Sequence, residues 1–115
     1  MLIGELATRA GTTIRALRYY EQQHLLHPRR TSNGYRDYDE SALVRVANIR
    51  QLLSMGLTAN DIREFLPCLD QEMKHGPVCA ESTEIITGRL VAVEEKIAAL
   101  DAVRARLTEA LARAD

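Results

Sequence analysis

Apolar residues recur at heptad spacing through the last third of the chain, and this pattern limits the possible folds more than any other. The intervals are 4, 3, 4, 3, 7 and 4 residues, over Ile86, Leu90, Val93, Ile97, Leu100, Leu107 and Leu111. No proline interrupts the stretch from Glu81 to Ala114. An a/d seam of this kind is typical of a coiled coil. A protein this small cannot cover the seam by itself. We therefore expect residues 81–115 to form a helix that packs on a partner helix. The chain's own fourth helix, folded back, is the alternative partner.

One position of this seam is polar. Arg104 stands where the a residue between Leu100 and Leu107 belongs. A charged a residue weakens a coiled coil or fixes its register.

A short helix with a cationic and aromatic face is predicted from Ile14 to about Gln23. Thr13 is a suitable N-cap, because its hydroxyl can accept a hydrogen bond from a free backbone N–H of the first turn. Helical spacing separates a mainly apolar stripe from a neighbouring stripe of Arg15, Arg18 and Tyr19. The apolar stripe consists of Ile14, Leu17 and Glu21. Guanidinium groups bind phosphate and guanine, and tyrosine hydroxyls reach phosphate oxygens, so this helix suits a DNA groove.

A basic hairpin is predicted directly after this helix. Asn33-Gly34 is a preferred dipeptide for a type I′ turn, because both central positions need a positive φ. Arg29-Arg30 precede the turn and Tyr35-Arg36 follow it. A helix followed by a basic hairpin indicates a winged helix-turn-helix, in a mainly α protein.

Several linked motifs resemble the DNA-binding domain of the MerR family of bacterial transcription regulators. They are Arg18-Tyr19-Tyr20-Glu21, Leu25-Leu26, Arg29-Arg30 and Asn33-Gly34-Tyr35-Arg36. The resemblance extends from Leu2 to about Pro67, and the last helix is similar to that family's dimerisation helix. It implies a homodimer with antiparallel helices that binds a palindromic promoter site. It also implies that the dimer bends and untwists the duplex so that RNA polymerase can engage.

The expected DNA contacts come from the helix and the hairpin. They are Thr13, Arg15, Arg18, Tyr19, Tyr20, Arg29, Arg30, Tyr35 and Arg36. For Tyr20, and for Tyr38 at the end of the hairpin, a place in the core is an equally good interpretation.

The charge distribution supports a basic head on an acidic tail. The whole chain of 115 residues has a formal net charge of −1. Up to Arg36, six arginines and two glutamates give +4, so the remainder carries −5. Apolar residues make up 46% but aromatic residues only 4%, which favours a helical protein with a thin core that gains from a second copy. The division we expect is a DNA-binding domain at 1–67, a linker or effector loop at 68–80 and the coiled-coil helix at 81–115.

The remaining helices of the head follow from periodicity and caps. Ile3, Leu6, Ala7 and Ala10 predict a first helix that ends at Gly11. A third helix, capped by Asp39 or Ser41, is expected to turn Leu43, Val46, Ala47, Ile49 and Leu53 inward and to end at Gly56. A fourth begins at Thr58 with Asp61 in a capping box, turns Ile62, Phe65 and Leu66 inward and stops at Pro67. Arg45 and Arg50 are expected on a solvated face, with phosphate contact as the alternative.

Two cysteines and a histidine mark the candidate effector region. Cys79 precedes the long helix, where the helix dipole favours a thiolate, and Cys68 and His75 lie upstream. Metal-sensing members of the family it resembles place their first cysteine ligand here, so the resemblance implies a possible soft-metal ion at Cys79. No cysteine follows Cys79 to supply the usual further ligands. Inert buried thiols, a redox or electrophile sensor, a metal site and a structural disulfide therefore remain open. With no signal peptide or membrane-spanning run, we expect a cytoplasmic protein with reduced thiols.

Three functional classes are compatible with these features. The favoured one is a dimeric DNA-binding regulator, and the alternatives are an effector-independent architectural or phage-type module and a protein–protein adaptor that uses the coil. No catalytic set stands out, so we do not expect an enzyme. His24 and His27 flank Leu25-Leu26 and are interpreted as turn residues in preference to metal ligands.

Overall fold

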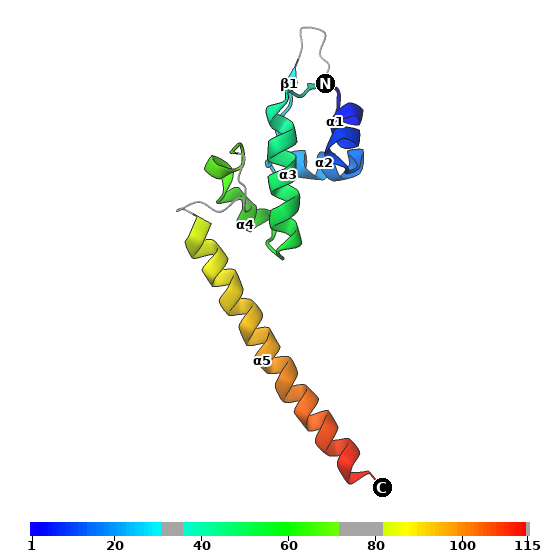
Figure 1. Ribbon diagram of the computed structural model, residues 1–115, viewed down its shortest axis with the longest axis vertical. Helices are drawn as coiled ribbons and strands as arrows, with labels where there is room; N and C mark the ends of the chain where they lie inside the picture. The colour runs from blue at the N-terminus through cyan, green and yellow to red at the C-terminus, as the bar shows by residue number, and fades with distance from the viewer. Residues whose placement is uncertain (31–35, 72–81, 115) are drawn as a thin grey trace. The chain divides into compact units, whose positions relative to one another are not determined.

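The computed structural model describes residues 1–30, 36–71 and 82–114, without the side chains of Arg30 and Arg36. These residues form two compact units, Met1–Ser82 and Thr83–Asp115, which we describe separately. The first unit holds helices α1 (Ile3–Ala10), α2 (Ile14–Gln22), α3 (Ser41–Ser54) and α4 (Ala59–Arg63), the strands β1 (Arg29–Arg30) and β2 (Arg36–Asp37), and the 3-10 helix η1 (Leu66–Cys68). The second unit is helix α5 (Thr83–Arg113). The fold is mainly α, a winged helix-turn-helix followed by a long helix (Figure 1).

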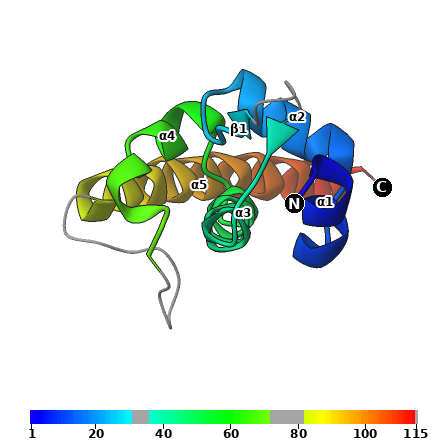
Figure 2. The ribbon, with the colours of Figure 1, turned by 90° about the horizontal axis from the view of Figure 1, so that it is seen from above.

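Helix α3 is the centre of the first unit. Helices α1 and α2 lie on one side of it and α4 on the other, which is clearest when α3 is viewed nearly end-on (Figure 2). Its buried side chains Val46, Ile49 and Leu52 are fully shielded from solvent, and so are Leu6 of α1 and Leu17 of α2. Each large apolar side chain buried in this way contributes roughly 1.5–3 kcal/mol, so this core sets the orientation of α1 and α2.

The helix boundaries of the helix-turn-helix agree with the caps in the sequence. Gly11 ends α1 with φ of 70°, a left-handed conformation that glycine adopts without strain. The Thr13 hydroxyl accepts a hydrogen bond from the Ala16 backbone N–H at 3.0 Å, which confirms Thr13 as the N-cap of α2. At α4, the predicted capping box of Thr58 and Asp61 is present in both directions.

Three details of α3 and α4 correct the predictions. Glu40 is the N-cap residue of α3 but makes no side-chain cap, while Asp39 accepts a hydrogen bond from the Ser41 N–H. Ala47 is exposed, and its neighbour Asn48 is buried instead because its amide donates to the Leu69 and Gln71 carbonyls. Helix α4 ends at Arg63, before Pro67, which lies inside η1.

The wing is a two-stranded antiparallel hairpin. Arg29 is opposite Asp37 and Arg30 is opposite Arg36 in its register. The Asn33-Gly34 turn and Tyr35 lie outside the described residues. The Tyr38 backbone N–H donates to the Met1 carbonyl at 2.8 Å, and the Met1 amino group pairs with the Asp37 carboxylate at 2.8 Å. The base of the wing is thereby fixed to the residues that precede α1.

Helix α5 has 31 residues and is about 46 Å long at 1.5 Å per residue. None of its residues is buried. Six of the seven residues of the predicted seam are exposed, from 38% at Val93 to 76% at Leu111, and Ile86 is intermediate. Among the described residues, no helix has both the length and the apolar character needed to cross a membrane.

Candidate nucleic-acid interface

The exposed side of α2 presents cations and an aromatic ring. Arg15 and Arg18 are exposed, and Tyr19 is 46% exposed. Leu17 and Tyr20 hold the opposite side in the core, with 0% and 5% exposure. Because α2 is anchored through one side only, the cationic stripe predicted from the sequence faces solvent.

The burial of Tyr20 corrects its place among the expected DNA contacts. Its ring belongs to the core, and desolvation raises the pKa of its hydroxyl, with the Arg50 charge acting in the opposite direction. Tyr38 is also a core residue, with 2% exposure. Tyr19 and Tyr20 are adjacent in sequence, but Tyr19 faces solvent and Tyr20 faces the core, because successive residues on a helix point 100° apart.

Most arginines elsewhere in the first unit hold the fold together. Arg50 donates to the Ala10 carbonyl at the end of α1 at 2.7 Å, and Arg63 donates to the Gln23 carbonyl at the end of α2 at 2.9 Å. Arg45 donates to the Leu25 carbonyl at 2.6 Å and to both oxygens of Asp70. Arg50 is exposed, as the solvated-face interpretation expects, although it also binds a backbone carbonyl. Arg45 is only 16% exposed in its side chain and is held by the Leu25 carbonyl and Asp70, which corrects that interpretation for Arg45.

Arg15 and Arg18 differ from these arginines. Within the described ranges, neither makes a hydrogen bond or an ion pair with another residue of the chain. Arg9, by contrast, is paired, because it donates two hydrogen bonds to the Glu40 carboxylate, at 2.8 and 2.9 Å, and so joins α1 to the start of α3. Two guanidinium groups on one helix are thus available to an external anion.

On the wing, Arg29 is 72% exposed in its side chain and lies 3.6 Å from the Asp39 carboxylate. This contact is long and exposed, so it is weak and leaves the guanidinium accessible to a phosphate. The strand positions of Arg30 and Arg36 place both residues on the same hairpin, whereas Tyr35 falls in the part of the chain that is not described.

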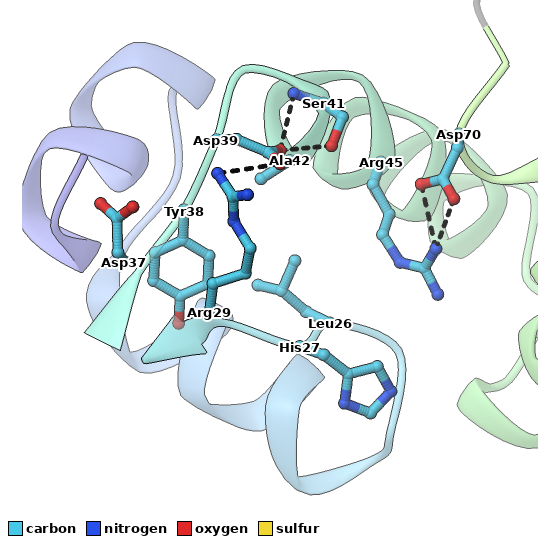
Figure 3. A pocket seen from close by; sticks show the side chains of 10 residues that line it. All are labelled: Leu26, His27, Arg29, Asp37, Tyr38, Asp39, Ser41, Ala42, Arg45 and Asp70. Atoms are coloured by element: carbon cyan, nitrogen blue, oxygen red, sulfur yellow. Dashed lines mark hydrogen bonds and ion pairs between the residues drawn. The ribbon is translucent and has the colours of Figure 1, made fainter. Parts of the chain in front are cut away.

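A pocket of about 180 Å³ lies beside the wing, between the turn after α2 and the start of α3 (Figure 3). Its charged groups are used within the chain: Arg29 lies against Asp39, Arg45 binds Asp70, and Asp37 pairs with the Met1 amino group. Arg45, Asp70 and Asp37 are thus already paired, whereas Arg29, whose contact with Asp39 is long and exposed, stays accessible to an anion.

The candidate effector residues are only partly described. Cys68 is 2% exposed and disulfide-bonded, which corrects the expectation of a reduced thiol. A disulfide sulfur is not a thiolate, so in this state Cys68 is unsuited to bind a soft metal. His75 and Cys79 lie outside the described residues. In the part of the chain that is described, no three histidine, cysteine or acidic side chains come together as a metal site.

His24 lies in the turn after α2, and His27 lies in the segment that leads to β1. His24 has a positive φ of 61°, and its backbone N–H donates to the Glu21 carbonyl at 3.0 Å. This confirms the interpretation of His24 as a turn residue.

Sequence reasoning missed two exposed side chains of α2. Gln22 is exposed and follows Arg18 by four residues, so the spacing of Arg15, Arg18 and Gln22 could have shown that they share a face. Ile14, assigned to the apolar stripe, is 39% exposed. Its position in the first helical residue could have suggested this, because that residue protrudes beyond the helices that cover Leu17.

The hairpin wing and the one-sided anchoring of a cationic α2 define a winged helix-turn-helix DNA-binding protein. The family model for the MerR helix-turn-helix regulatory protein matches residues 1–68, and the model described as MerR, DNA binding, matches residues 43–110. The chain therefore belongs to the MerR family of helix-turn-helix regulators, which are transcriptional regulators and not enzymes.

Individual relatives resemble most of the chain. The HTH-type transcriptional regulator ZntR of Escherichia coli is 40% identical over 106 residues, which are 91% of this chain and 74% of that protein. CueR of Yersinia pestis, another HTH-type transcriptional regulator, is 31% identical over 93% of this chain and 76% of its own length. Among solved structures, the transcription regulator PbrR691 from Ralstonia metallidurans in complex with lead(II) has a TM-score of 0.80 and 31% identity, covering 95% of this chain and 84% of that one.

Proposed function

We propose that this protein is a homodimeric, sequence-specific transcription regulator that binds a palindromic promoter site in the cytoplasm and distorts it. The observation that carries the proposal is the contrast between arginines. Arg45, Arg50 and Arg63 bind carbonyls within the chain. Arg15 and Arg18 have no partner among the described residues and face solvent on one helix. Two exposed, unpaired guanidinium groups are suited to phosphate and guanine.

The proposed contact surface joins α2 and the wing. Arg15, Arg18 and Tyr19 would enter the major groove, with Thr13 at the start of the helix, as recognition helices do. Arg29 and the wing residues Arg30, Tyr35 and Arg36 would bind the neighbouring backbone. The Thr13 hydroxyl accepts from Ala16 and can still donate its own proton to a phosphate oxygen.

The proposed dimer forms through α5. Leu90, Ile97, Leu100 and Leu107 are each more than half exposed, which is unfavourable for a helix in water. Burying this seam against the same helix of a second copy, antiparallel as the family resemblance implies, removes that surface from water. The paired helices then fix the distance between the two α2 helices, which sets the spacing of the two half-sites.

The proposed distortion of the promoter is supported by the family to which the chain belongs and by the number of its exposed cations. Bending a site of this size costs on the order of several kcal/mol. Contacts from two copies of α2 and two wings supply the phosphate binding that offsets this cost. The distorted duplex would bring promoter elements into a spacing that RNA polymerase can engage.

For signal input, we propose thiol chemistry at Cys68 and Cys79. Support comes from the disulfide at the buried Cys68, next to the segment that leads to α5. Reduction of that disulfide by a cellular dithiol, with two electrons and two protons, would release Cys68 as a thiol. The solved relative that binds lead(II) makes a soft metal the competing signal, and Cys79 and His75 would then be its ligands here.

A gel-shift titration tests DNA binding. The duplex is the region upstream of the protein's own gene, and the variants are Arg18→Ala and Arg106→Ala. We expect Arg18→Ala to weaken binding at least tenfold and to lower the slope of log K against log salt by about one unit. Arg106→Ala removes an exposed arginine of α5 and should bind like the wild type. Absence of wild-type binding at low salt would refute the proposal.

A promoter assay tests signal input separately. Wild type, Cys68→Ser and Cys79→Ser are compared after oxidants, aldehydes and Zn²⁺, Cu⁺ or Pb²⁺. A response to oxidants that either serine variant abolishes supports thiol sensing, and a response to metals alone supports the metal alternative. Promoter activity that depends on the protein but that no treatment or cysteine variant changes would instead indicate an effector-independent architectural protein.

A further inference from the structure

Ile14 is a partly exposed apolar residue at the start of the helix that carries the exposed Arg15 and Arg18. It is the first residue of α2 and is 39% exposed, whereas Leu17, one turn later, is 0% exposed. Arg15 follows it directly and Arg18 lies four residues further along the same helix, and both are exposed. Packing in the core therefore does not explain why an apolar residue occupies this partly exposed position.

The Ile14 side chain lies close to helix α1. Its Cδ1 atom lies 3.9 Å from the point where a Cβ on Gly4 of α1 would stand, which is ordinary van der Waals contact. Branching at Cβ also leaves isoleucine one strongly preferred χ1 rotamer in a helix. Ile14 thus lies close to Gly4 of α1, and its χ1 angle is restricted, while 39% of the residue remains exposed next to Arg15.

Only one base edge in the major groove offers an apolar partner for such a group. Thymine carries a C5-methyl there, while the other bases present hydrogen-bond donors and acceptors. In a helix-turn-helix the residues at the start of the recognition helix contact base edges. An apolar group at the first position of α2 matches a methyl and mismatches the polar edge of the other bases.

We propose that Ile14 determines sequence specificity by contacting the C5-methyl of a thymine in each half-site. The inference rests on the proposed DNA-binding function and deepens it, because it names a base. Arg15 and Arg18 would supply affinity and contacts to phosphate and guanine, while Ile14 would select thymine. From the transfer free energy of one methyl-sized group, removing the contact should weaken binding about fourfold per half-site.

The experiment removes the two contact partners separately and together. Sites are first selected from random duplex DNA with the wild-type protein and with Ile14→Ala. The wild-type site is then made with deoxyuridine in place of the selected thymine, which deletes only the methyl group. Ile14→Val, a smaller change that keeps the branched Cβ, is included in case Ile14→Ala folds poorly, and circular dichroism checks both variants.

Met55→Ala is the matched control. Met55 is also an apolar side chain in the first unit, 44% exposed, but it lies at the end of α3. We expect deoxyuridine to weaken the wild type and Met55→Ala about fourfold per half-site, Ile14→Val less, and Ile14→Ala not at all. The Ile14→Ala selection should lose the thymine preference at that position and keep the rest of the site.

The outcomes separate this inference from the function on which it rests. If wild type selects a defined site but deoxyuridine has no effect, or affects Ile14→Ala equally, the methyl contact is refuted while DNA binding stands. If the wild type binds no duplex at low salt, the proposed function itself is refuted, and the inference with it.

Discussion

The Tyr38 hydroxyl donates a hydrogen bond to the Glu21 carboxylate and thereby joins the end of the wing to the last turn of α2. Tyr38 is 2% exposed, so the contact lies at the edge of the core. A hydrogen bond to a charged acceptor is stronger than one between neutral groups. This hydrogen bond therefore adds to the core packing of Leu17 and Tyr20 in fixing α2 relative to the wing.

Tyr38→Phe should destabilise the first unit by about 1–2 kcal/mol, because it removes this hydrogen bond and leaves the ring in place. Urea unfolding, followed by circular dichroism, measures the change. Tyr19→Phe is the control, since Tyr19 is 46% exposed and should unfold like the wild type. Equal stability of all three proteins would show that the contact contributes nothing.

Arg45 offers a second test, because its two partners differ in exposure. Its side chain is 16% exposed and donates to the buried turn at Leu25, whereas Asp70 is 57% exposed. Arg45→Met should cost about 1–3 kcal/mol by leaving the Leu25 carbonyl without its donor. Asp70→Asn should cost less than about 1 kcal/mol, as exposed ion pairs do. A larger loss in Asp70→Asn than in Arg45→Met, again by urea unfolding, would contradict this ranking.

Local signals in the sequence were enough to predict that each helix exists and where some of the caps lie, although not the N-cap of α3 or the end of α4. Thr13 and the Thr58–Asp61 box act within three residues of themselves, so their partners are visible in the sequence. Gly11 likewise ends α1 as its position predicted. These features depend on neighbours in the chain and not on the tertiary fold.

The roles of the arginines could not be predicted in the same way. In the sequence, Arg45 and Arg50 look like any other cations on a helix. Their partners are backbone carbonyls 20 and 40 residues earlier in the chain, which no local pattern reveals. Periodicity also placed Ile14 with Leu17, although the first residue of a helix extends past the elements that cover the next turn. Only the packing of α1 against α2 distinguishes the two positions.

The pair between Arg9 and Glu40 predicts a pH dependence. Hydrogen bonding to Arg9 is the main cause that lowers the pKa of Glu40 below its ordinary value of 4.5. Because the folded-state pKa is the lower one, the pair stabilises the protein above pH 4.5 and is lost as the pH falls through the folded-state pKa. Glu40→Gln should therefore show a shallower loss of stability on acidification below pH 4.5 than the wild type.

Unfolding midpoints in urea, measured from pH 6 to pH 3, provide this comparison. Glu64→Gln removes an exposed carboxylate that makes no ion pair with other described residues, and it should follow the wild-type curve. If Glu40→Gln has the same acid limb as the wild type, the pair does not contribute to stability.

The seam of α5 gives the sharpest test of assembly. Leu100 is a d residue of the heptads and is 68% exposed, so a charge there would have to be buried in the dimer or prevent its formation. We expect Leu100→Glu to sediment as a monomer at micromolar concentration and to lose most of its affinity for a palindromic duplex. Ala98→Glu introduces the same side chain two residues away, at an exposed b position, and should remain dimeric. Both variants add the same charge, and Ala98→Glu loses at least as much helix propensity as Leu100→Glu, so a dimer lost only in Leu100→Glu points to the seam. If both sediment as dimers, Leu100 lies outside the interface and the spacing of the half-sites must be fixed by another surface.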